Sequence, residues 1–155
     1  DKSISGGIIN IGGSSILTYG EKPDQSPWKV AITDPRGEDY LGVLELKGRY
    51  HISTSGDYEK YFTQNKKRYH HILNPKTGYP AESGLISVTV VSARGVVSDG
   101  LSTACFVLGK EKALKLVDRY DAQAILVDQK KKVYMTPGIR DAFTQIDDGY
   151  RITDQ

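Results

Sequence analysis

The sequence predicts an α+β domain in which a pair of helices covers one face of a largely antiparallel sheet. Three observations predict this fold class. Short β-rich runs fill the first half, a long run of β-branched residues follows, and two amphipathic helical patterns come next. The length of 155 residues, with 38% hydrophobic and 26% charged residues, suits a single domain over residues 1–155.

The first half of the chain is predicted to consist of strands divided by turns. Gly, Pro and Asp separate its β-rich runs, as expected where a chain reverses direction. The run from Gly42 to Leu46 alternates apolar and polar residues, and Lys47-Gly48-Arg49 precedes the next run. We therefore expect these two runs to form a β-hairpin. The predicted strands are residues 8–11, 16–19, 28–33, 42–46 and 50–54.

The second half begins with the strongest strand and then changes period. Residues 85–92 are β-branched nearly throughout. Apolar residues then recur at i, i+3, i+4 and i+7, which predicts a helix from about Ser98 to Leu108, ended by Gly109. The remaining predicted elements are a second amphipathic helix over residues 111–120, a hairpin of residues 124–127 and 132–135, and a closing strand over residues 150–153.

Composition excludes several classes of protein. The net charge is +2 and the basic runs are short, so no nucleic-acid partner is expected. A single cysteine excludes an internal disulfide, and the apolar stretch around Cys105 predicts a buried thiol rather than a nucleophile. No apolar run is long enough to span a membrane, and no signal peptide is visible. Because the chain starts at Asp1 without a methionine and enters a strand almost at once, we expect an excised piece of a longer chain.

The densest polar segment runs from Ser53 to Gly78. Its first part, Ser53 to Asp57, is typical of a turn that ends a strand and caps a short helix, here over residues 58–62. The alternative is a ligand-binding loop, because glycine and small hydroxyl residues let backbone amides approach a phosphate.

Two adjacent histidines, His70 and His71, follow in the same segment. Asn74-Pro75 and Thr77-Gly78 predict two consecutive turns after His71, in a loop that is still rich in polar side chains. A neutral imidazole in such a loop could act as a general base or orient a phosphate. The alternative is a structural hydrogen bond at the edge of a strand.

The helix predicted to begin near Ser98 contains a second candidate pair. Asp99 and Thr103 are four residues apart, so both side-chain oxygens are expected on one face of the helix. A carboxylate with a hydroxyl suits Mg²⁺, which prefers oxygen ligands and keeps waters or phosphates in its other positions. The alternative is a helix cap, with Ser98 or Asp99 as the N-cap residue. The sequence has no Cys/His cluster with zinc spacing and no P-loop.

Five segments of the chain occur together, in the same order, in one known family. They are Asn10-Ile11-Gly12-Gly13, Trp28 to Pro35, Ser53 to Glu59, His71 to Gly78 and Ser98 to Ala104. On these segments the chain resembles the C-terminal part of the ApbE family, over about residues 8–138. The family pattern has aspartate where this chain has Asn74, and either residue caps such a turn through its side-chain oxygen. The resemblance also implies that part of the flavin site and at least one metal ligand lie upstream.

The resemblance implies an FAD:protein FMN transferase, which uses Mg²⁺ to move FMN from FAD to a threonine hydroxyl of a target flavoprotein and releases AMP. An Mg²⁺-dependent FAD pyrophosphatase that gives FMN and AMP, and a non-catalytic flavin-binding fragment, are the alternatives. The family works as an extracytoplasmic lipoprotein tethered to the cell membrane, and the same location is expected here. By resemblance, Asp99 and Thr103 bind the metal, His71 helps deprotonate the acceptor hydroxyl, and Gly12, Gly13, His71, Ile72, Thr77 and Gly78 lie against FAD.

Overall fold

The structure is a computed structural model that describes residues 4–153. Its helices are α1 (Gly95–Leu108), α2 (Lys110–Arg119) and a short 3₁₀ helix, η1 (Pro137–Ala142). Its strands are β1 (Gly7–Ile11), β2 (Ser15–Tyr19), β3 (Trp28–Thr33), β4 (Tyr40–Leu46), β5 (Tyr50–Gly56), β6 (Tyr61–Gln64), β7 (Lys67–His70), β8 (Leu85–Ser92), β9 (Gln123–Asp128), β10 (Lys132–Met135), β11 (Phe143–Gln145) and β12 (Arg151–Thr153).

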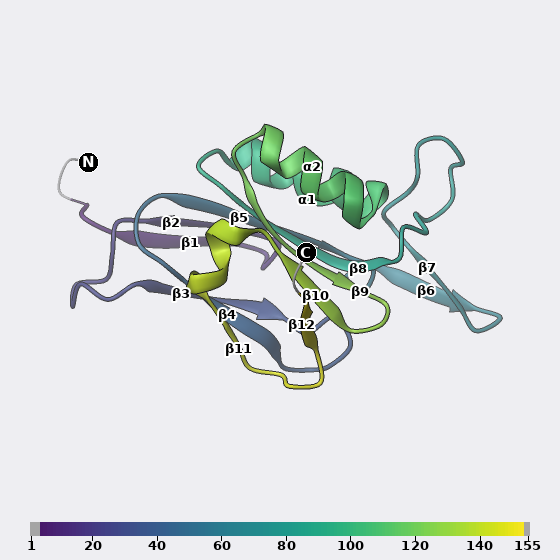
Figure 1. Ribbon diagram of the computed structural model, residues 1–155, viewed down its shortest axis with the longest axis horizontal. Helices are drawn as coiled ribbons and strands as arrows, with labels where there is room; N and C mark the ends of the chain where they lie inside the picture. Colours follow the sequence, from purple (N-terminus) through teal and green to yellow (C-terminus); the bar gives the residue numbers. More distant parts are fainter. Residues whose placement is uncertain (1–3, 154–155) are drawn as a thin grey trace.

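The strands form a large sheet, a small sheet and a separate hairpin. The large sheet has the order β1-β2-β5-β8-β9-β10-β12, the small one has the order β11-β4-β3, and β6 pairs with β7. Neighbouring strands are antiparallel except β10 and β12. Helices α1 and α2 lie on one face of the large sheet (Figure 1). The predicted fold class is therefore confirmed, and the small sheet on the opposite face is an addition to it.

Two hydrophobic cores fill the spaces on either side of the large sheet. On the helical side, Val88 of β8 packs with Phe106 of α1 and with α2. On the other side, Val91 of β8 packs with Leu44 of the small sheet. Strand β8 is buried along its whole length because both faces of the sheet are covered. Each large apolar side chain buried in this way contributes roughly 1.5–3 kcal/mol to folding.

The predicted burial of the Cys105 thiol is confirmed. Cys105 is fully buried in the core between α1 and the sheet, and this burial raises the pKa of the thiol to about 11. A thiol in that environment stays protonated at neutral pH and is not a nucleophile. No helix within residues 4–153 is both long and apolar enough to cross a membrane.

The predicted hairpin between residues 42–46 and 50–54 is wrong, although both segments are strands. β4 pairs with β3 and β11 in the small sheet, whereas β5 pairs with β2 and β8 in the large one. The connection through Gly48, which has φ of 109°, leads the chain from one sheet to the other. A local turn signal cannot indicate that each strand has a longer-range partner. The second predicted hairpin, β9 with β10, is confirmed.

The short helix predicted over residues 58–62 is also wrong. Strand β5 continues through Gly56, and after a turn the chain enters β6, which pairs with β7. Asn65 and Lys66, the two residues between β6 and β7, have φ of 51° and 63°. Positive φ at both central positions suits the right-handed twist of a two-residue hairpin. The hairpin therefore prevails over the weak capping signal at Ser53 to Asp57.

Candidate functional site

The end of β5 connects the large sheet to α1 through hydroxyl groups. Ser53 Oγ lies 3.1 Å from Ser98 Oγ. Ser55 Oγ lies 2.9 Å from Ser102 Oγ and 3.0 Å from Thr103 Oγ1. Because alternate residues of a strand face the same side, Ser53 and Ser55 both point at the helix. The polar segment that resembled a turn is thus a strand that fixes the position of Thr103.

Asp99 and Thr103 both lie on exposed positions of α1, one turn apart. Helix α1 begins at Gly95 with Arg94 as its N-cap residue, so neither Ser98 nor Asp99 is the cap. Within residues 4–153 the Asp99 carboxylate has no salt-bridge partner. A carboxylate without a cation beside a fixed hydroxyl forms a pair of oxygen donors on one helical face.

This donor pair fits Mg²⁺ but does not enclose it. Among the described residues, no group of three or more His, Cys, Asp or Glu side chains is placed to hold a metal ion. Mg²⁺ is usually bound by one or two carboxylates, with waters and substrate phosphates in the other positions. Asp99 and Thr103 are the residues of this chain that would hold the ion.

A groove opens beside Asp99, between α1 and the outer strands of the large sheet. Its volume is about 330 Å³, and Asp99, Ser53 and Val96 line it together with Ile9 and Ile11 of β1. The lining of the groove therefore contains both polar and apolar side chains. Such a groove suits a ligand that has both an anionic and an apolar part.

The predicted flavin-contact glycines, Gly12 and Gly13, form the turn between β1 and β2, with φ of 63° and 79°. The backbone N–H of Gly13 donates to the Asn10 side chain, and the next carbonyl, that of Ser14, accepts from Thr54 N–H at 2.9 Å. The turn is thus attached to β5 beside Ser55. A Cβ at either glycine would meet nothing within 4 Å, so the space around this turn is open.

The loop after His71 has the two consecutive turns that the sequence predicts. The Asn74 carbonyl accepts from Thr77 N–H and Gly78 N–H, and the Asn74 side chain accepts from Lys76 N–H at 3.0 Å. Gly78 has φ of 71°, and the Thr77 hydroxyl accepts from the backbone N–H of Tyr79. Thr77 and Gly78 are both exposed, so a ligand can reach their backbone.

His71 is exposed and lies at the base of the β6–β7 hairpin. Its backbone N–H donates to the carbonyl of Lys60 at 3.1 Å, and its ring Nδ1 lies 3.3 Å from the same oxygen. A carbonyl can only accept, so this contact places the ring proton on Nδ1 and leaves Nε2 as the basic nitrogen. Ile72, which follows, is buried in the core, so only its backbone could meet a ligand.

His70 has a different role from its neighbour. Its ring packs edge-on against Phe106 with 5.4 Å between ring centroids, and its Nε2 lies 3.2 Å from the Ala81 carbonyl oxygen. Burial lowers the pKa of His70, although the Ala81 carbonyl opposes that shift. His70 therefore makes the structural hydrogen bond that was the alternative to a catalytic role. His71 is the accessible imidazole of the two.

The candidate residues are only partly brought together. Hydrogen bonds connect β5 to Thr103 and to the turn of Gly12 and Gly13. Among the described residues, no hydrogen bond connects His71 to either of them. The chain thus presents the two oxygen donors of Asp99 and Thr103 on α1, and separately the imidazole of His71 at the base of the hairpin.

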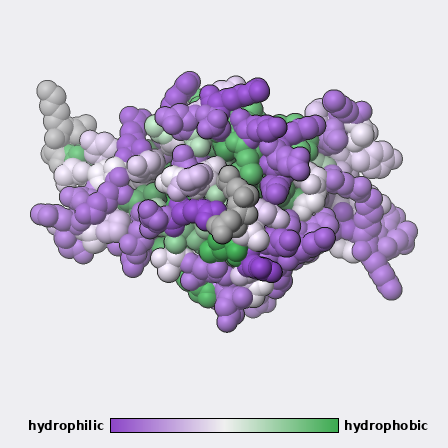
Figure 2. Space-filling model, in the orientation of Figure 1, coloured by the Kyte–Doolittle hydropathy of each residue, from purple (hydrophilic) through white to green (hydrophobic). Residues whose placement is uncertain are grey.

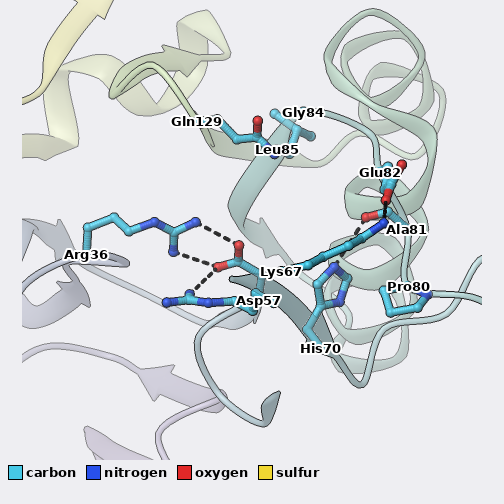
Figure 3. Close-up of a pocket in the computed structure, with 11 residues that line it drawn as sticks. Arg36, Asp57, Lys67, His70, Pro80, Ala81, Glu82, Gly84, Leu85 and Gln129 are labelled. Carbon is cyan, nitrogen blue, oxygen red and sulfur yellow. Dashed lines mark hydrogen bonds and ion pairs between the residues drawn. The ribbon is translucent and has the colours of Figure 1, made fainter. Parts of the chain in front are cut away.

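Sequence reasoning missed a cluster of ion pairs below the hairpin. Arg36 donates from both terminal nitrogens to the two Asp57 oxygens at 2.7 Å (Figure 3). Arg68 Nη1 lies 3.4 Å from Asp57 Oδ1. These residues line a cavity of about 620 Å³ that extends to His70 and Glu82. The only sequence signal for this cluster is Asp57, the acidic residue of the Ser53 to Asp57 segment. Nothing in the local sequence links Asp57 to Arg36 or to Arg68.

Comparison with known proteins shows which family the chain resembles in sequence and in structure. The sequence model of the ApbE family matches residues 1–126. A relative from Klebsiella pneumoniae, named FAD:protein FMN transferase, is 37% identical over 150 residues, which are 95% of this chain and 45% of the relative. The ApbE protein of Thermotoga maritima superposes with a TM-score of 0.80 at 35% identity, over 88% of this chain and 44% of that one. The Pseudomonas stutzeri flavinyl transferase ApbE gives a TM-score of 0.72 at 37% identity, over 91% and 44%.

The chain spans a little less than half the length of these relatives. Within that span, the agreement includes both the sequence and the arrangement of helices and strands. The family expected from the five sequence segments is thereby confirmed. This chain belongs to the ApbE family.

Proposed function

We propose that the protein transfers FMN from FAD to a threonine hydroxyl of a target flavoprotein and releases AMP. The main support is the pair on α1, an exposed carboxylate without a salt-bridge partner among the described residues beside a hydroxyl fixed by Ser55. The second support is the exposed imidazole of His71, whose Nε2 is left basic. Relatives that bear the name FAD:protein FMN transferase support the same reaction.

In the proposed reaction, the acceptor oxygen attacks the phosphorus on the FMN side of the FAD pyrophosphate. The bond from that phosphorus to the bridging oxygen breaks, and AMP leaves with the bond electrons. His71 Nε2 takes the proton of the acceptor hydroxyl, because a hydroxyl is a weak nucleophile without a nearby base. Bound Mg²⁺ would neutralise the charge that develops on the phosphate oxygens.

Other parts of the chain orient the flavin nucleotide in this proposal. The open turn of Gly12 and Gly13 and the exposed turn of Thr77 and Gly78 offer accessible backbone that a flavin nucleotide can approach closely. The contact from His71 Nδ1 to the Lys60 carbonyl keeps the ring in the tautomer that accepts a proton at Nε2. Positioning and electrostatics therefore account for the chemistry without a covalent intermediate on the chain.

The experiment incubates the whole protein with FAD, Mg²⁺ and an acceptor flavoprotein. AMP is measured by chromatography, and the acceptor is measured by mass spectrometry. The proposal expects AMP and covalently bound FMN in equal amounts. AMP with free FMN and an unmodified acceptor would show an FAD pyrophosphatase instead. No AMP at all would contradict both reactions and favour a flavin-binding role.

A further inference from the structure

The β6–β7 hairpin extends from the body of the molecule as a separate two-stranded sheet (Figure 1). Within residues 4–153, β6 pairs with β7 alone, so its outer edge has no neighbouring strand. All four residues of β6 are exposed. An edge of this kind can accept an extended peptide through backbone hydrogen bonds.

One face of this hairpin is aromatic and leads to His71. Phe62 and Tyr69 are cross-strand partners whose rings stack at 5.1 Å between centroids and 6° between planes. Phe62 is nevertheless 61% exposed. Side chains alternate along β7, and His70 points inward, so Tyr69 lies on the outer side. His71, which directly follows β7, is exposed as well.

The hairpin is held firmly on its other side. Arg68 Nη1 lies 3.4 Å from Asp57 Oδ1, and His70 Nε2 lies 3.2 Å from the Ala81 carbonyl oxygen (Figure 3). On the outer side, Lys67 Nζ lies 2.6 Å from Glu82 Oε1 and 5.7 Å from the centroid of the Tyr69 ring. Arg68 also lies over the ring of Tyr61, 4.1 Å from its centroid. These contacts hold the hairpin to the rest of the molecule, so little conformational freedom is lost when a partner binds to its outer face.

The hairpin region is also the basic part of the chain. Residues 59–82 contain five lysines or arginines and two glutamates, a net charge of +3, whereas the whole chain has +2. The remainder of the chain is therefore slightly acidic. Figure 2 shows mainly hydrophilic side chains over the end of the molecule where β6 and β7 lie. Lys67 and Arg68 already pair with Glu82 and Asp57. The exposed Lys60, Lys66 and Lys76 have no salt-bridge partner within residues 4–153, and they complement a partner segment that is acidic.

We propose that the outer face of the β6–β7 hairpin docks the acceptor flavoprotein, through an extended acidic segment that delivers its hydroxyl to His71. The proposal rests on the proposed function and adds how the protein partner is recognised. The Phe62–Tyr69 stack supplies apolar contact, the free edge of β6 supplies backbone pairing, and the lysines select acidic residues.

The test titrates the 155-residue chain at low salt with a short synthetic peptide in which aspartates flank a threonine, observed by NMR. The control peptide has lysines in place of the aspartates. Phe62→Ala should weaken binding about tenfold, as expected for loss of an aromatic contact. Lys66→Glu should weaken it severalfold, and added salt should reduce that difference. The matched controls Tyr120→Ala and Lys115→Glu alter exposed residues at the end of α2 and on α2, and should leave binding unchanged.

The signals of Tyr69 and His71 should shift on binding, and those of α2 should not. Equal binding of both peptides, absence of binding, or equal effects of the test and control substitutions would overturn the docking proposal. If Phe62→Ala instead weakens binding of FAD, the face binds a nucleotide and the proposal is wrong. Failure of the proposed function is a separate result, because it is measured as absence of AMP formation in the whole protein.

Discussion

At the scale of single residues, two adjacent histidines have different surroundings because a strand alternates its side chains. His70 is buried against Phe106, and His71 is exposed at the base of the hairpin. The sequence shows two imidazoles in a row but not which one points inward. That assignment depends on Phe106, which lies far along the chain in α1.

The first prediction concerns His71→Ala. The substitution should lower the rate of FMN transfer by about 10²–10⁴-fold, the usual contribution of a general base. FAD binding should change much less, because the main task proposed for the imidazole is to accept a proton and not to bind the nucleotide. Transfer rates and FAD affinity are measured on the same preparations. An equal loss of both would show that His71 is a binding or structural residue.

The second prediction concerns pH and His70. Burial lowers the pKa of His70 below the value of about 6.5 that an unfolded chain has. As pH falls below about 6.5, the unfolded state therefore binds the proton first, and the free energy of unfolding decreases. His70→Gln should show a smaller decrease between neutral and acidic pH, measured by urea unfolding at several pH values.

The comparison with His70→Gln isolates His70. Burial also lowers the pKa of His51, and that residue is common to both proteins. Identical pH dependence of stability in the wild-type protein and in His70→Gln would show that His70 takes up its proton equally easily in the folded and unfolded states.

At the scale of secondary-structure elements, the sequence predicts those whose signal is local. β8 is recognisable from its β-branched residues, and α1 from its apolar periodicity. The hairpin expected between β4 and β5 fails because both strands pair with distant segments. The helix expected before β6 fails because the positive φ of Asn65 and Lys66 closes a hairpin instead.

The third prediction concerns the contact between β4 and β11. A Cβ on Gly42 would lie 2.3 Å from the Phe143 ring and 2.6 Å from the Thr144 carbonyl oxygen. Gly42→Ala should therefore destabilise the protein by about 1–3 kcal/mol, as overpacking does. Gly7→Ala in β1, where a Cβ would meet nothing within 4 Å, is the control and should change stability by less than about 0.5 kcal/mol. Similar unfolding midpoints for both variants would contradict the close approach of β11.

At the scale of the whole molecule, ion pairs join segments that the sequence does not connect. Asp57 links Arg36, which follows β3, to Arg68 in the hairpin. The family motifs locate Asp57 but say nothing of its partners. The same limit applies to the candidate site, since β5 holds Thr103 through Ser55 and the Gly12–Gly13 turn through the hydrogen bond from Thr54 N–H to the Ser14 carbonyl.

The fourth prediction concerns Asp57→Asn. Its side chain is 11% exposed and holds two guanidinium groups, so the substitution leaves both without a carboxylate. We expect a loss of about 3 kcal/mol in the free energy of unfolding. Glu45→Gln removes the exposed ion pair with Lys29 and should cost less than about 1 kcal/mol. Equal, small effects of both substitutions in urea unfolding would show that the Asp57 cluster does not hold the hairpin to the body.

The central claim is that Asp99 and Thr103 hold the metal ion on which FMN transfer depends. The most direct measurement is the rate of transfer across a Mg²⁺ titration for the whole protein, for Asp99→Asn and for Asp118→Asn, which changes an exposed aspartate on α2. The account predicts that Asp99→Asn lowers the rate at low Mg²⁺ by at least about a hundredfold, because a metal ligand is lost. Asp118→Asn should match the wild-type protein. An Asp99→Asn variant with an unchanged rate and an unchanged Mg²⁺ requirement would contradict the account.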